Sequence, residues 1–516
     1  MTIGRLPARR SAGILGATKQ ARGTDSRLKF LVDTNVLICL EPVTPDLEPT
    51  AELAAEFLAL AHDGGHPVVR HAAQRVDDAN DRDEARRRAR AVLFRKYPTL
   101  GRVRDLRPEF DSLLGTPQHG SNDWVDNQLL GAVEARAVDF LVTEDAGIHR
   151  KAKRVALGAQ VLLVRDALDM LQTFLDRAPA APPAVEWVKA TELDEADPIF
   201  DSVRAEYPGL DEWLGRCRLE SRDVALIRPR GGPYAGVCIL AKKTDKFGAS
   251  GKFLKICQFK VSEKFGGRRY GELMLKTVFD YRRTNGYDFA YVTVFEHHDS
   301  LVRLFEDFGF ERWVDRTPQG ELVLIKSFRP TDEDRASLDP LTFHRRFGPP
   351  ALELMPERTF VIPIQPRFHK LLFPEAEPQL GLGLEEADRP YGNALRKAYL
   401  SHSRIHPMPS GSTLLFYRSG DARAITCIGV LEAARREHDA DAIATLVGKR
   451  TVYSLDEIAK LAAKPVLALL FRQDRLLDRP IGLAEALGVQ LLSAAPQSIA
   501  AIRQEGFEWL TRRLGA

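Results

Sequence analysis

Two short apolar runs, far apart in the chain, each lead into an acidic residue. The first run begins at Phe30 and reaches Asp33, and the second begins at Phe140 and reaches Asp145. Apolar runs of this length are typical of buried parallel strands, whose carboxyl ends gather functional residues at one edge of a sheet. The sequence therefore predicts an α/β fold with carboxylates at a sheet edge.

The chain is long enough for several domains. It has 516 residues, 44% of them hydrophobic, and domains usually contain about 100–200 residues, so we expect roughly three. A proline-rich segment at 177–184 and a second interruption between Phe328 and Phe360 mark the boundaries. We expect domains at residues 27–176, 186–328 and 359–516.

Composition favours a cytoplasmic protein without a membrane partner. The five cysteines form no C-x-x-C pair, and no apolar run approaches the ~20 residues that span a bilayer. Residues 1–27 are rich in arginine and lack the apolar stretch of a signal peptide. The net charge is only +3, but local basic clusters such as residues 86–88 and 150–154 favour a polyanionic partner.

Periodicity predicts an α/β multidomain chain with a different sheet in each domain. The first domain alternates strands and helices, which predicts a parallel sheet with strands at 29–33, 67–70, 139–143 and 160–164. The middle domain predicts a mixed sheet with strands at 224–228, 234–243, 252–261, 288–295 and 321–328 and helices at 270–284 and 299–308. The last domain predicts a small open β-barrel with strands at 359–364, 412–418, 424–432 and 466–471 and helices at 392–400 and 454–462.

The acidic residues of the first domain follow a recognisable order. Asp33-Thr34-Asn35 ends one strand, Asp123 and Asp126 open a helix, and Thr143-Glu144-Asp145 ends another strand. Over residues 27–176 this order resembles the PIN-domain nucleases. The resemblance implies a ribonuclease in which Mg²⁺ or Mn²⁺, which prefer oxygen ligands, activates water. The metal ligands that it implies are Asp33, Asp77, Asp123, Asp126 and Asp145, and all of these except Asp123 are also expected to be catalytic. Asp77 is the weakest match, and Asp78 is the alternative to it.

The middle domain contains a strand, a glycine- and arginine-rich loop and a helix. Glycines let the backbone approach a ligand, and the N–H groups that open a helix can bind a pyrophosphate. With the helix that precedes Gly309-Phe310, this order resembles the GNAT N-acetyltransferases over residues 186–328. The resemblance implies that acetyl-CoA is bound by these residues: Val261, Gly266, Gly267, Arg268, Arg269, Tyr270 and Gly271.

Two positions depart from the GNAT pattern. Arg269 stands where the family has a glycine, and Phe305 stands where many members have a tyrosine that protonates the departing thiolate. Phenylalanine cannot donate a proton, so another group must act. Glu296, His297 and His298 follow the strand at 288–295 and are candidate acids or bases, with Glu296 taken as catalytic.

The last domain resembles the PUA-like group that includes the ASCH and EVE domains. The features that carry the resemblance are an aromatic strand introduced by Gly411, a second strand interrupted by Gly429, and a basic and aromatic segment that follows. The resemblance implies a cleft that binds RNA or modified bases. The residues expected to line it are Arg396, Lys397, Tyr417, Arg450 and Tyr453, although the aromatic residues could equally fill the barrel core.

Together these resemblances predict a metal-dependent ribonuclease joined to an acetyl-CoA-dependent N-acetyltransferase, acting on RNA or the translation machinery as a toxin or defence factor. One alternative is an acetyltransferase whose outer domains only bind an RNA or ribonucleoprotein substrate. Another is a non-catalytic scaffold that senses acetyl-CoA. The expected partners are RNA, with tRNA among the candidates, and acetyl-CoA, while an antitoxin or regulatory protein and a homo-oligomer remain open.

Overall fold

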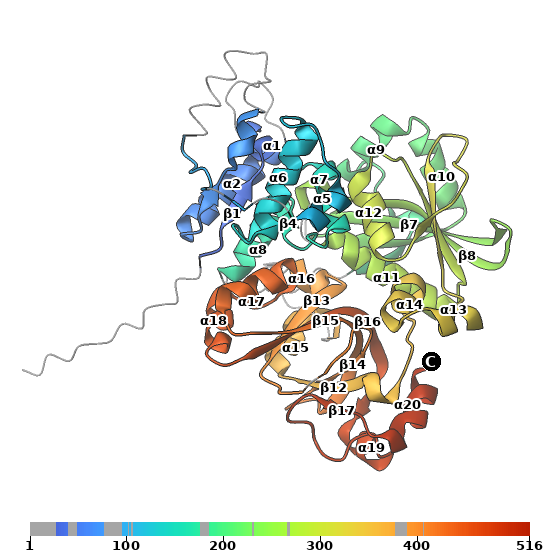
Figure 1. Cartoon of the computed structure of the whole chain (residues 1–516). Coiled ribbons are helices and arrows are strands. Elements are labelled where there is room, and N and C mark those ends of the chain that lie inside the picture. Colours follow the sequence, from blue (N-terminus) through green and yellow to red (C-terminus); the bar gives the residue numbers. More distant parts are fainter. Residues whose placement is uncertain are drawn as a thin grey trace, which may run out of the picture.

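The computed structural model describes residues 27–39, 49–76, 95–175, 185–229, 232–265, 269–376, 390–405 and 407–515, apart from residues 102, 105 and 106. Three sheets fall in consecutive stretches of the chain, which we call the N-terminal part (27–175), the central part (185–328) and the C-terminal part (329–515). Figure 1 shows them in blue to cyan, in green to yellow, and in orange to red, packed against one another. Within the described residues, no helix is both long and apolar enough to cross a membrane.

The N-terminal sheet is parallel, as predicted, with the strand order β2-β1-β3-β4. Its apolar strands alternate their side chains between two helical layers, because successive residues of a strand face opposite sides. Phe30 and Val32 face α2 and α8, whereas Leu31 faces α5, α6 and α7. The strands are β1 (Phe30–Val32), β2 (Val68–Val69), β3 (Phe140–Val142) and β4 (Val161–Leu162). The helices are α1 (Thr34–Ile38), α2 (Pro49–Asp63), α5 (Pro108–Leu114), α6 (Asn122–Glu134), α7 (Ala146–Arg154) and α8 (Val164–Phe174).

The central sheet has the order β10-β11-β9-β8-β7-β6-β5 and is antiparallel except between β8 and β9. Helices α11 and α12 cover one face of this sheet, and α9 and α10 cover the other. The strands are β5 (Val185–Lys189), β6 (Asp223–Ile227), β7 (Gly236–Lys246), β8 (Ala249–Val261), β9 (Phe289–Val294), β10 (Glu311–Arg312) and β11 (Leu322–Ser327). The helices are α9 (Asp201–Glu206), α10 (Leu210–Leu219), α11 (Tyr270–Asn285) and α12 (Asp299–Asp307).

The C-terminal sheet has the order β13-β16-β15-β14-β12-β17, with β12 and β14 parallel. Its strands are β12 (Thr359–Ile364), β13 (Arg396–Ser401), β14 (Thr413–Arg418), β15 (Ala424–Glu437), β16 (Val466–Gly482) and β17 (Ala500–Ala501). Its helices are α13 (Asp332–Ser337), α14 (Pro340–Phe347), α15 (Pro366–Leu372), α16 (Pro390–Asn393), α17 (Ala440–Val447), α18 (Leu455–Ala462), α19 (Leu483–Gly488) and α20 (Phe507–Leu514).

The helix predicted at 392–400 is wrong. The short helix α16 ends at Asn393, and residues 396–401 form the edge strand β13, which pairs with β16. The stretch contains alanine and leucine, which favour helices, but its pairing with β16 and its burial on both faces override that weak local preference.

One hydrophobic cluster runs from the N-terminal part into the C-terminal part. It joins Phe30 and Phe140 of the first sheet to Val447 and Phe471 of the last. At the boundary, a Cβ atom added to Gly448 would lie 3.6 Å from the Phe140 ring, and Thr445 donates a hydrogen bond to Asp139 at 3.2 Å. The two outer parts therefore share a core, although the central part separates them in the sequence.

Truncation of Phe140 tests this shared core. Its side chain is fully buried and its ring stacks on Phe30 with 5.6 Å between the ring centroids. We expect Phe140→Ala to lower the free energy of unfolding by about 3–5 kcal/mol, measured by urea denaturation of the full chain. Leu219→Ala on α10 is the control, since Leu219 is 89% exposed, and an equal loss in both variants would contradict the shared core.

Candidate functional site

The carboxyl ends of β1 and β3 bring three predicted residues together. Thr143 donates a hydrogen bond from its hydroxyl to Asp33 Oδ2 at 2.7 Å, and Asn35 Nδ2 lies 3.3 Å from the same hydroxyl oxygen. Asp33 also caps α1 by accepting from the backbone N–H of Thr34 at 2.6 Å. The predicted meeting of these polar residues at one sheet edge is therefore present, and Asp33 is held there with only 8% of its surface exposed.

A lysine lies between the two acids of α6. Lys151 Nζ, from α7, lies 2.6 Å from Asp123 Oδ1 and 2.9 Å from Asp126 Oδ2. Its hydrogen bond lowers the pKa of Asp123, whereas burial raises the pKa of Asp126 despite the same ammonium group. Lys151 therefore neutralises the acid pair that the sequence assigned to a metal ion.

The remaining predicted ligands do not complete a metal site. Asp145 caps α7 by accepting from the backbone N–H groups of Gly147 and Ile148, and Asp77 lies outside the described residues. Across the described part of the chain, no three of the predicted aspartates bring carboxylate oxygens within 4.8 Å of one another. As arranged, these side chains do not fit a divalent ion, because the Lys151 ammonium group supplies the positive charge between two of them.

Removal of that lysine should create metal affinity if the carboxylates can otherwise act as ligands. In Lys151→Met, Asp123 and Asp126 lose their counter-charge, and we expect Mn²⁺ to bind at least tenfold more tightly than to the wild type in calorimetric titrations. Lys153→Met is the matched control, because Lys153 lies on the same helix but pairs with Asp307. Equal Mn²⁺ affinity in all three proteins would rule out a latent metal site at these acids.

In the central part, two parallel strands separate at their carboxyl ends. Strands β8 and β9 pair from Phe253 with Phe289 to Ile256 with Val292, and the pairing stops there although β8 continues to Val261. Main-chain groups that no longer bond across a strand pair can bond an extended ligand placed between them. The gap begins next to α11, whose N-terminus has no side-chain cap hydrogen bond.

This arrangement fits a nucleotide-containing cofactor such as acetyl-CoA. An uncapped helix N-terminus favours a phosphate, and the strand gap suits an extended amide chain. Val261 ends β8, and Tyr270 and Gly271 open α11. Arg269 takes the left-handed backbone conformation, with φ 58°, which glycine adopts more readily than other residues. Gly266, Gly267 and Arg268 lie outside the described residues.

The predicted catalytic residue Glu296 is held by two arginines. Its carboxylate lies 2.7 Å from Arg316 and 3.6 Å from Arg312, and the hydrogen bond from Arg316 lowers its pKa. A carboxylate with a lowered pKa is a poor proton acceptor. Phe305 is fully buried and packs against Phe259 and Phe310, so it serves the core of the central part.

A second carboxylate near the end of β9 contacts histidines rather than arginines. Glu206, the last residue of α9, lies 2.7 Å from Nε2 of His297 and 2.9 Å from Nε2 of His298. The Phe295 ring stacks on both Tyr207 and His297, which fixes the turn that carries the two histidines. Within the described residues, Glu206 and these histidines form the one set of three metal-ligating side chains whose donor atoms lie within 4.8 Å of one another.

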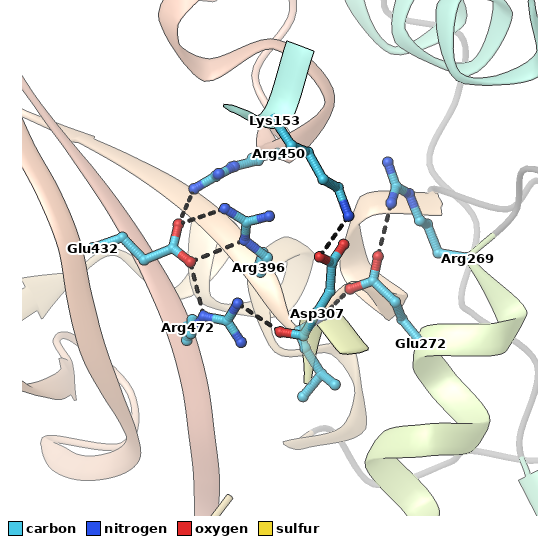
Figure 2. Close-up of polar contacts among 9 residues, drawn as sticks. Lys153, Arg269, Glu272, Asp307, Arg396, Glu432, Arg450 and Arg472 are labelled. Atoms are coloured by element: carbon cyan, nitrogen blue, oxygen red, sulfur yellow. Dashed lines mark hydrogen bonds and ion pairs between the residues drawn. The ribbon is translucent and has the colours of Figure 1, made fainter. Parts of the chain in front are cut away.

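The predicted RNA-binding arginines lie at the junction of the three parts. Figure 2 shows Glu432 of β15 surrounded by Arg396, Arg450 and Arg472. Burial alone would raise the pKa of Glu432, but the three guanidinium groups hold it well below its ordinary value. Arg472 also donates to the carbonyl oxygen of Asp307 at the end of α12. These arginines therefore lie where the C-terminal part meets the central part.

The same junction reaches the start of α11. Asp166 of α8 lies 3.4 Å from Arg269 and 3.0 Å from Lys449, joining residues from all three parts. Glu272, in the first turn of α11, accepts from Arg269 at 2.7 Å and from the backbone N–H of Leu395 at 2.8 Å. The N-terminus of α11 is thus enclosed by both outer parts of the chain.

The other three predicted RNA-binding residues lie elsewhere. Lys397 is fully buried, its ammonium group donates to the carbonyl oxygen of Gly392 at 2.7 Å, and burial lowers its pKa to about 7. Tyr417 and Tyr453 are also buried, yet both line a cavity of about 780 Å³. That cavity is lined by further aromatic and polar side chains, among them Phe368, Tyr399, Ser401, His402, Ser403 and Ser419.

Three candidate functional residues were not predicted from the sequence. Lys151 belongs to the basic cluster 150–154, but the sequence does not indicate which acidic residues it contacts. Glu206 lies about ninety residues from His297 and His298, and Glu432 stands inside a strand. Of these contacts, only the paired histidines at a strand end could be noticed in the sequence. The others join residues that are distant in the chain, and such contacts depend on the tertiary fold.

Comparison with known proteins agrees with the geometry of the central part. Residues 187–310 match the acetyltransferase (GNAT) family, so this part of the chain is a GNAT domain, and the match supports acetyltransferase function. No curated protein matches the chain.

Among solved structures, a GNAT family acetyltransferase from Elizabethkingia anophelis with acetyl-CoA bound is similar to this chain, with 16% identity and a TM-score of 0.22. It covers 28% of this chain and 97% of its own. ASCH from Zymomonas mobilis has 17% identity and a TM-score of 0.24, and covers 30% of this chain and 95% of its own.

Proposed function

We propose that the protein is an acetyl-CoA-dependent N-acetyltransferase whose N-terminal and C-terminal parts position an RNA or ribonucleoprotein acceptor. The observation that carries the proposal is the gap between β8 and β9 beside the start of α11, within the segment that matches the GNAT family. Bound acetyl-CoA would supply a thioester carbonyl carbon for attack by an amine.

Glu206 and His298 supply the base in this proposal. A carboxylate can only accept, so the 2.9 Å contact requires the hydrogen of the imidazole on Nε2. Nδ1 is then left to take a proton from the attacking amine. His297 makes the same contact with the other oxygen of Glu206 and can replace its neighbour. The amine nitrogen bonds to the carbonyl carbon as the carbon–sulfur bond breaks, and the thiolate leaves.

The outer parts favour binding over nuclease chemistry. Lys151 neutralises Asp123 and Asp126, while the C-terminal cavity of about 780 Å³ has the size and the mixed aromatic and polar lining that suit a small planar group. A nucleobase of the acceptor RNA is such a group, and stacking on a tyrosine is a common way of holding one.

Transfer of label from acetyl-CoA tests the acetyltransferase. Purified full-length protein is mixed with [¹⁴C]acetyl-CoA and cell extract, and the protein and RNA fractions are counted separately. We expect label in one fraction, and a rate about 100-fold lower for Glu206→Gln, because general base catalysis contributes about 10²–10⁴-fold. Glu220→Gln is the control, since Glu220 pairs with Arg222 at the protein surface. A wild type that transfers no label would overturn the proposal.

A metal-dependent ribonuclease that acts as a toxin or defence factor is the second candidate. The clustering of Asp33, Asn35 and Thr143 at one sheet edge favours it, although the Lys151 ammonium group would have to leave the acid pair. If it operates, Asp126→Asn should abolish the new RNA ends that appear when the wild type is expressed, as seen by sequencing RNA ends. Unchanged ends with this variant would exclude Asp126 from any cleavage.

A further inference from the structure

The three-part junction carries more positive than negative charge. Among the described residues, Figure 2 shows the guanidinium groups of Arg396, Arg450 and Arg472 around the single carboxylate of Glu432. The nearby Asp307 carboxylate pairs with Lys153. Two positive charges are therefore unmatched in a region largely withdrawn from water, and unmatched buried charge is unfavourable unless an anion joins it.

Two of the guanidinium groups can still reach a ligand. Glu432 accepts from Nε and Nη2 of Arg396 and from Nη1 of Arg450, and a guanidinium group has five N–H donors. The Arg396 side chain is 35% exposed and that of Arg450 is 13% exposed. Arg472, at 5%, is turned instead to Glu432 and to Asp307. An anion would therefore meet Arg396 and Arg450.

The junction also lies beside the expected cofactor. Arg396 follows Leu395, whose backbone N–H bonds Glu272 in the first turn of α11, and the Glu272 carboxylate contributes to the raised pKa of Arg396. Figure 2 shows the pair of Arg269 and Glu272 on α11 next to the cluster around Glu432. A ligand bound at the start of α11 would therefore lie beside the cluster around Glu432.

We propose that Arg396 and Arg450 of the C-terminal part bind the 3′-phosphate of CoA, so that the cofactor site is built from two parts of the chain. This inference rests on the proposed acetyltransferase function. A phosphate monoester carries nearly two negative charges at neutral pH, which matches the two unmatched positive charges. CoA carries its 3′-phosphate on the ribose, apart from the pyrophosphate that an uncapped helix N-terminus would hold.

Binding of CoA and of 3′-dephospho-CoA to the full-length protein, measured by calorimetry, tests the assignment. We expect the wild type to bind CoA at least tenfold more tightly than 3′-dephospho-CoA. Arg450→Gln and Arg396→Gln should each remove most of that difference by weakening CoA alone, because charge-assisted hydrogen bonds to phosphate are lost. Arg435→Gln, exposed three residues beyond Glu432 on β15, should bind both ligands like the wild type.

Controls separate the possible failures. Glu432 keeps two guanidinium partners in either single variant, and thermal unfolding checks that each variant is folded. If Arg396→Gln does not fold, Arg396→Lys replaces it, because lysine preserves the positive charge. Equal affinity of the wild type for the two ligands overturns the assignment while leaving the acetyltransferase intact. Failure of the wild type to bind either ligand overturns the proposed function itself. If the Arg396→Gln and Arg450→Gln variants bound a single-stranded RNA more weakly than the wild type but bound CoA equally well, these arginines would be assigned to nucleic-acid binding and the proposal would be contradicted.

Discussion

Asp166 is the contact on which the arrangement of the three parts most depends. It stands in α8 of the N-terminal part and meets Arg269 of the central part and Lys449 of the C-terminal part. Burial by itself would raise the pKa of this carboxyl, but the two cations hold it well below its ordinary value. Removing one partner of such a buried group leaves an uncompensated charge, which costs about 3–5 kcal/mol. Asp166 therefore ties the start of α11 to both neighbouring parts, together with the hydrogen bond from Leu395 to Glu272.

The sheets could be predicted from the sequence because their signals are local. Apolar runs marked β1, β3 and β12, and the period of the helix after residue 270 marked α11. Strand β13 was mistaken for a helix because its pairing with β16 is not visible in its own residues. Asp33 and Thr143 could be brought together by the rule that parallel strands share an edge, but nothing in the sequence tells that Lys151 turns toward Asp126.

Three carboxylates, those of Asp126, Glu296 and Glu206, illustrate how the partner of a carboxylate decides its chemistry. Asp126 and Glu296 each lie next to a cation, so each is neutralised where it stands. Glu206 instead faces the imidazole Nε2 atoms of His297 and His298. Acidic residues at strand and helix ends thus have a structural role in one case and, in the proposed mechanism, assist proton transfer in the other.

The hydrophobic cluster shared by the first and last sheets has a consequence for how the chain is made. During synthesis the N-terminal part leaves the ribosome first, yet Phe140 and its neighbours gain their full cover only when β16, which begins at Val466, has also emerged. Until then an apolar face stays open to water while the whole central part is translated, and exposed surface of this kind attracts chaperones or leads to aggregation. The order of the three parts along the chain therefore makes the last one a folding partner of the first.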